Sequence, residues 1–99
     1  MNNQLQTRLL AAFPDAFISS YTHEDWSSIS FSGGKHQICL AFKDAFKAAQ
    51  CAFAVTHERV DVNLDDVGQL FAGTFLVDYD EEPLDGYYFV TMEAYTLND

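Results

Sequence analysis

The sequence predicts one α+β domain spanning residues 1–99, with a single antiparallel sheet of about five strands and two helices on one face of it. Two segments have apolar residues at helical spacing, and two longer regions alternate apolar and polar residues as paired strands do. The composition is 48% hydrophobic and 15% aromatic, which is enough for one buried core in a chain of 99 residues. The expected order of elements is α-β-β-β-α-β-β.

The first helix is expected over residues 4–13. Asn3 and Gln6 have the spacing of a capping box, and Pro14 ends the helical pattern. Between them, apolar residues recur at helical spacing: Leu5, Leu9 and Phe13.

A first strand is expected over residues 16–21 and a polar turn over 22–25. The next two strands, 26–32 and 35–42, flank Gly33 and Gly34, a pair typical of a two-residue hairpin turn. If Ser32 lies opposite Lys35, the apolar residues of both strands share one face. The resulting pairs are Phe31 with His36, Ile29 with Ile38, and Ser27 with Leu40, while Gln37 and Cys39 lie on the opposite face.

The second helix is expected to begin after Asp44, a favourable N-cap residue, and to end near residues 57–59. A short strand over residues 60–64 and a turn over 65–68 are expected to follow. The predicted apolar stripe of this helix consists of Ala45, Phe46, Ala49, Ala52 and Phe53.

A second hairpin is expected from strands 71–81 and 86–97, joined by a turn over residues 82–85. Pairing Glu81 with Gly86 places three apolar pairs on one face: Tyr79 with Tyr88, Val77 with Val90, and Phe75 with Met92. The other face then holds Leu76, Asp78, Asp80, Tyr87, Phe89, Thr91 and Glu93.

Charge is distributed very unevenly along the chain. The formal net charge is -10, yet residues 1–60 contain five acids and five bases, so the last 39 residues carry ten acids and no base. Such a surface repels nucleic-acid backbones and anionic membranes and attracts basic proteins. A basic protein surface is therefore the expected partner. Direct binding to nucleic acid or to a membrane is not expected.

The start of the chain has no basic segment followed by a long apolar run, so neither a secretory signal nor a membrane span is expected. A cytoplasmic location follows as the expectation. In that compartment Cys39 and Cys51 are expected to remain reduced thiols.

One stretch has partial metal-ligand spacing. Asp61, Asn63 and Asp65 match the first three ligand positions of an EF-hand loop. The match then fails, because Asp66 stands where glycine is needed and Ala72 where a bidentate glutamate is needed.

The sequence also disfavours zinc binding and catalysis. His36 and Cys39 are three residues apart on a strand and so point to opposite faces. No nucleophile elbow and no phosphate-binding glycine loop are present. No metal site, no cofactor and no catalytic residue are expected.

The predicted function is that of a small acidic, non-enzymatic interaction module. Tyrosine combines apolar area with a polar tip, which suits it to interfaces, and neighbouring carboxylates steer basic partners. The candidate partner-binding residues are Asp78, Asp80, Glu81, Glu82, Tyr87, Phe89 and Glu93. A sharper form is a nucleic-acid mimic, whose carboxylates occupy phosphate positions in the groove of a nucleic-acid-binding protein.

Two other interpretations of the second hairpin remain open from the sequence. Its outer face could be covered by a helix of the same chain. It could also be covered by another copy of the chain, which would make a homodimer. Alternatively, the protein could be a small ligand-binding domain or enzyme with a pocket between sheet and helices, around Trp26, His36 and Cys39. A ligand specific for the native state would raise the thermal midpoint, which separates this class from an interaction module.

Overall fold

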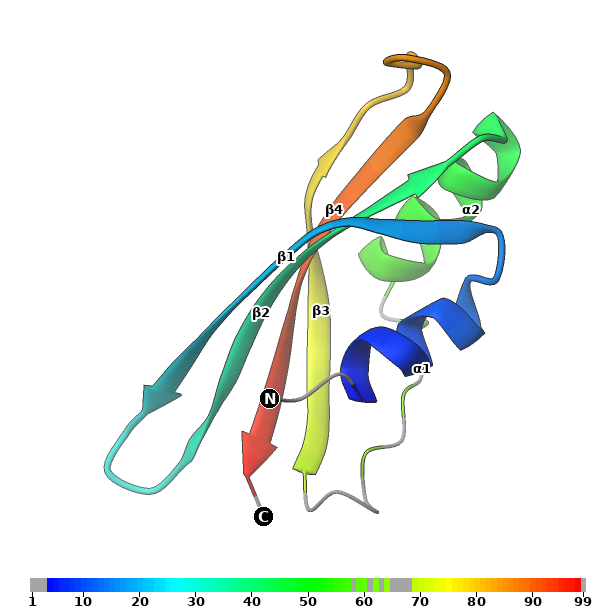
Figure 1. Ribbon diagram of the computed structural model, residues 1–99. Coiled ribbons are helices and arrows are strands. Elements are labelled where there is room, and N and C mark those ends of the chain that lie inside the picture. Colours follow the sequence, from blue (N-terminus) through cyan, green and yellow to red (C-terminus); the bar gives the residue numbers. More distant parts are fainter. Residues whose placement is uncertain (1–3, 58, 61, 63, 65–68, 99) are drawn as a thin grey trace.

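The computed structural model describes residues 4–57, 59, 60, 62, 64 and 69–98. Two helices and four strands make up the fold, and the antiparallel sheet has the order β1-β2-β4-β3. Both helices lie on one side of the strongly twisted sheet (Figure 1). The elements are α1 (Gln4–Ala12), β1 (Ala16–Ser27), β2 (Ser32–Phe42), α2 (Ala45–Thr56), β3 (Gln69–Tyr79) and β4 (Tyr88–Asn98).

The predicted class, α+β with one antiparallel sheet and two helices, is confirmed, but the sheet has four strands and not about five. The expected turn over residues 22–25 is wrong, because β1 continues through it and pairs with β2 along its whole length. This stretch looks like a loop because it is polar. Polar residues are tolerated there because β1 is an edge strand, exposed along one side.

The first hairpin turns at a different place from the one predicted. The Ser28 N–H donates to the Phe31 carbonyl at 2.7 Å, and Ser27 lies opposite Ser32, so the turn comprises residues 28–31. The pairs expected for Phe31, Ile29 and Ser27 are therefore wrong. The true partners across β1 and β2 are Ile18 with Leu40, Tyr21 with Ile38, and His23 with His36.

Gly33 and Gly34 lie inside β2, and neither has a positive φ. At Gly33 the backbone of β4 passes so close that a Cβ would overlap the Thr96 carbonyl oxygen. Glycine in a strand interior often marks such a close approach of another backbone. The glycine pair therefore allows the strands to pack closely. The sequence-based prediction had assigned the pair to a turn.

The faces of β2 were predicted correctly even though the turn was not. His36, Ile38 and Leu40 are buried towards the helices, and the intervening Gln37 and Cys39 point to the other face. Alternation along a strand has a period of two residues and does not depend on which residue forms the turn.

Both helices lie where they were expected. In α1, Leu5 and Leu9 are fully buried. In α2, the Asp44 carboxylate caps the helix by accepting hydrogen bonds from the backbone N–H groups of Phe46, at 2.7 Å, and Lys47, at 3.2 Å.

The predicted apolar stripe of α2 is largely wrong. Phe46 and Phe53 are exposed, and the buried residues are Ala48, Cys51, Ala52 and Val55. These side chains are small or β-branched, so the helix can approach the sheet closely. Outside the core, the Phe53 ring lies against the His57 ring at 4.1 Å.

The strand expected over residues 60–64 is not present at the described positions Val60, Val62 and Leu64. Val62 and Leu64 are nevertheless buried in the core cluster. Asp61, Asn63 and the turn expected over residues 65–68 lie outside the described residues.

The second hairpin forms as an antiparallel pair, but its turn is shorter than predicted. Asp85 and Gly86 both have positive φ angles, 54° and 84°, and Leu84 and Tyr87 exchange two backbone hydrogen bonds across them. Asp-Gly with both residues left-handed is the signature of a two-residue hairpin turn. The predicted turn over residues 82–85 and the pairing of Glu81 with Gly86 are therefore wrong.

Irregularities in β3 also change which residues face the helices. Register shifts between Phe71 and Gly73 and between Leu76 and Asp78 each give β3 one extra residue. Leu76, and not Phe75, lies opposite the buried Met92, and Phe75 lies opposite Glu93. The predicted pairs of Phe75, Val77 and Tyr79 are wrong because they assume unbroken alternation.

Candidate interaction surface

We call the side of the sheet that faces away from the helices the open face. Residues opposite one another on antiparallel strands share a face, so the buried Val90, Met92 and Ala94 mark the helix side of β4. The residues between them lie on the open face: Phe89, Thr91, Glu93 and Tyr95. The described helices lie on the other side of the sheet, so they leave this face uncovered (Figure 1).

An ionic cluster occupies the centre of the open face. The Lys35 ammonium lies 3.5 Å from a Glu93 carboxylate oxygen and 3.8 Å from one of Glu24. The Tyr95 hydroxyl donates to the other Glu93 oxygen at 3.1 Å. The pKa of Lys35 is raised, chiefly by Glu93, and the pKa of Tyr95 is raised by burial and by the same carboxylate.

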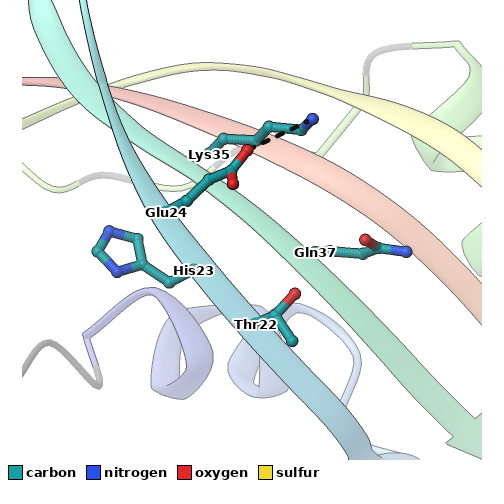
Figure 2. Close-up of a pocket in the computed structure, with 5 residues that line it drawn as sticks. All are labelled: Thr22, His23, Glu24, Lys35 and Gln37. Carbon is teal, nitrogen blue, oxygen red and sulfur yellow. Dashed lines mark ion pairs between the residues drawn. The ribbon is translucent and has the colours of Figure 1, made fainter.

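A hollow of about 120 Å³ lies beside this cluster. Figure 2 shows the side chains that line it: Thr22, His23, Glu24, Lys35 and Gln37. The dashed line marks the ion pair between Lys35 and Glu24, which come from neighbouring strands. Because Lys35 also pairs with Glu93, the charge of Glu93, a predicted partner-binding residue, is partly offset within the fold.

The remaining predicted carboxylates, Asp78, Asp80, Glu81 and Glu82, lie towards the end of the second hairpin. Together with Asp85 in its turn, we call them the acidic tip. All five are exposed, and within the described part of the chain none of them forms an ion pair. Asp78 lies opposite Thr91 and therefore on the open face. A shallow hollow of about 530 Å³ runs along residues 79–84.

Aromatic contacts lie on either side of the ionic cluster. The rings of Phe17 and Tyr87 meet edge to face at 5.2 Å, and those of Phe75 and Tyr95 at 5.7 Å. Lys43 lies 5.8 Å from the centre of the Tyr87 ring. The other predicted aromatic residue, Phe89, lies opposite Ala41 on the same face.

Sequence reasoning missed four contributors to this surface: Phe17, Glu24, Lys35 and Phe75. Lys35 and Glu93 are 58 positions apart in the sequence and meet because β4 lies between β2 and β3. Phe75 reaches the open face because of the register shifts in β3. The ion pair of Lys35 with Glu93 could have been predicted from their opposite charges only if β2 and β4 were already known to be neighbours.

The alternative pocket around Trp26, His36 and Cys39 is not assembled. His36 faces the helices and is 2% exposed, whereas Trp26 and Cys39 share the open face with their partners Gly33 and Thr91. The three side chains therefore lie on opposite sides of the sheet.

A chain of hydrogen bonds explains how the polar ring of His36 can be buried. The Tyr21 hydroxyl lies 2.7 Å from Nδ1, Nε2 lies 3.1 Å from Thr96 Oγ1, and Thr96 donates to the Gly34 carbonyl at 3.5 Å. Since Thr96 donates its proton to Gly34, its oxygen accepts from His36 Nε2–H, and Nδ1 accepts from Tyr21. Burial and the neighbouring His23 lower the pKa of His36 to about 4, so the ring is neutral at pH 7.

The two cysteines are separated by the sheet, with Cys39 on the open face and Cys51 buried in α2. Burial raises the pKa of Cys51 to about 12, which suppresses the reactive thiolate. We expect iodoacetamide at pH 8 to leave Cys51 unmodified in the folded protein and to alkylate it in urea. Peptide mass spectrometry would check this, and rapid labelling of native Cys51 would contradict its burial.

Among the described residues, no three histidine, cysteine or acidic side chains come together as metal ligands. The EF-hand-like residues Asp61, Asn63, Asp65 and Asp66 are outside the described part of the chain. Neither α1 nor α2 is long and apolar enough to cross a membrane. Comparisons of the chain with protein families, with curated proteins and with solved structures found no match.

Proposed function

We propose that the protein is a non-enzymatic interaction module that binds a basic protein through the open face and the acidic tip. The observation that carries the proposal is the acidic tip itself, whose five exposed carboxylates lack cationic partners in the described chain. Unpaired carboxylates within one segment of eight residues repel one another, and a basic partner relieves that repulsion.

The aromatic residues beside the acidic tip supply apolar contact area. Phe17 is 47% exposed, and its edge-to-face contact with Tyr87 holds both rings in place before a partner arrives. Ordered aromatic side chains lose little conformational entropy on binding, so they serve well as anchors. Charge would then guide the encounter, and the aromatic area would slow dissociation.

The net charge of -10 favours a protein partner over nucleic acid. In a narrower form of the proposal, the tip carboxylates imitate phosphates and DNA or RNA competes for the same partner. We further propose that the protein acts in the cytoplasm, where its separated thiols stay reduced.

Salt-graded affinity capture tests this function. The immobilised protein is expected to retain a basic protein from lysate, which is identified by mass spectrometry and then titrated in purified form. Binding should weaken steadily as salt rises, because surface charges are screened over about 8 Å at physiological ionic strength. Replacing Asp78, Asp80, Glu81 and Glu82 with lysine should abolish it.

A matched control separates local charge from total charge. The variants E81K/E82K and D15K/D25K change the net charge equally, but only the first alters the acidic tip; Asp15 and Asp25 lie beside Lys47 and His23. The first variant should lose binding and the second should retain it. Full affinity in the four-lysine variant would overturn the proposal.

A further inference from the structure

Strand β3 is an outer strand of the sheet, with β4 on one side and no described strand on the other (Figure 1). Four of its apolar side chains are exposed: Leu70, Phe75, Leu76 and Val77. The two register shifts leave residues 73–76 as a regular stretch in continuous register with β4. An unpaired edge of this kind is a template for another extended segment.

A groove of about 440 Å³ runs beside this edge. It is lined by Val55, Thr56 and His57 from the end of α2 and by Thr74, Phe75 and Leu76 from β3. Its position lets a side chain of an added strand enter between helix and sheet.

The groove contains a polar atom without a partner. Thr74 is 3% exposed, and its hydroxyl has no hydrogen-bond partner among the described residues. A buried hydroxyl left unpaired destabilises the native state, so such groups are rare unless a hydrogen-bond partner satisfies them. This unpaired hydroxyl independently indicates a missing polar neighbour.

We propose that the edge of β3 accepts an extended segment of the basic partner, which pairs with residues 73–76 and places a serine- or threonine-like hydroxyl near Thr74. This inference rests on the proposed function, because charge selects the occupant. The acidic tip begins at Asp78, two positions beyond the regular stretch, so basic residues of the segment lie against it.

The same charge argues against a second copy of this chain on β3. Residues 61–99 contain ten acids and no base, so self-pairing would bring like charges together. The sheet is antiparallel throughout, and an antiparallel addition runs opposite to β3. The basic residues must then precede the extended stretch in the partner's sequence.

Synthetic peptides test the direction and the site. The probe peptide has two lysines followed by alternating threonine and valine. One control peptide has the lysines at the other end, and a second has a proline in the centre of the alternating stretch. The probe should bind about fivefold more tightly than the reversed peptide. The proline peptide should not bind, because proline cannot complete the ladder. On binding, amide hydrogen exchange should slow at residues 73–76.

The variant T74V distinguishes a binding role of the hydroxyl from a structural one. Removing an unpaired buried hydroxyl should raise the melting temperature of the free protein. It should nevertheless lower the affinity for the probe peptide roughly fivefold. Unchanged affinity in T74V would overturn the role assigned to Thr74.

The outcomes separate this inference from the proposed function. Protection at Phe89 and Glu93 without protection at residues 73–76 would overturn strand addition and leave the basic-partner function standing. Equal binding of a lysine-free peptide at β3 would support strand addition and count against the basic partner. Concentration-dependent dimers protected at residues 73–76 without peptide would overturn the inference in favour of a second copy.

Discussion

Replacing Gly33 with alanine should destabilise the protein by about 3 kcal/mol, at the upper end of the cost of overpacking. The added Cβ would overlap the Thr96 carbonyl oxygen and lie 2.9 Å from its carbonyl carbon and 3.1 Å from Leu97 Cα. These are backbone atoms of β4, so no side-chain rotation relieves the contact, and β2 and β4 must separate. In a domain of this size the melting temperature should fall by roughly 15 °C.

Urea denaturation would measure the loss, with Gln37→Ala as the matched control. Gln37 lies on the same strand and the same open face as Gly33 but is exposed, so its truncation should change stability by less than about 0.5 kcal/mol. If G33A unfolded at the same urea concentration as the control, this result would contradict the close approach of the β4 backbone to Gly33.

Stability should also depend on pH through His36. Its native pKa, about 4, lies below the ordinary value of 6.5, so the unfolded chain binds more protons than the native state between these values. The contribution of neutral His36 is therefore complete above pH 6.5 and is lost as pH falls towards 4. At about 1.4 kcal/mol per pKa unit, the loss amounts to roughly 3 kcal/mol.

The comparison must be with a variant that lacks only the histidine, so that every other pH-dependent contribution to stability is shared by the two proteins. His36→Gln stays neutral and keeps polar groups near Tyr21 and Thr96. The groups that face the ring, His23 and Asp25, remain in both proteins. The wild type should lose more stability than H36Q from pH 6.5 to 4, and parallel losses would show that His36 is not buried in its neutral form.

The two hairpin turns were misplaced for different reasons. Gly33 and Gly34 match a hairpin turn, and the reason for glycine there, the backbone of Thr96, lies 63 residues away in the chain. The Asp85-Gly86 turn was the stronger local signal, yet the predicted turn was centred on Pro83 and Leu84, two residues too early. The glycine pair shows that a turn signal needs its strand partner before it can be placed, whereas the Asp-Gly pair could be recognised from its own residues.

The candidate site was predictable only in part. The uneven charge and the alternation along β4 were sufficient to propose Tyr87, Phe89 and four of the five tip carboxylates from the sequence, all but Asp85. The pairing of Glu93 with Lys35, the contact of Phe17 with Tyr87 and the groove at Thr74 were not predictable, because each joins elements distant in the chain.

By itself the sequence determined the features that depend on near neighbours. These are the two helices, the Asp44 cap, the alternating faces of β2 and β4, and the concentration of acids in the last 39 residues. The tertiary structure alone decided the placement of β4 between β2 and β3, the extra residues of β3 and the edge that this leaves unpaired. Helix caps and alternation are set by atoms within a few residues of one another, whereas strand order and register follow from the packing of the whole core.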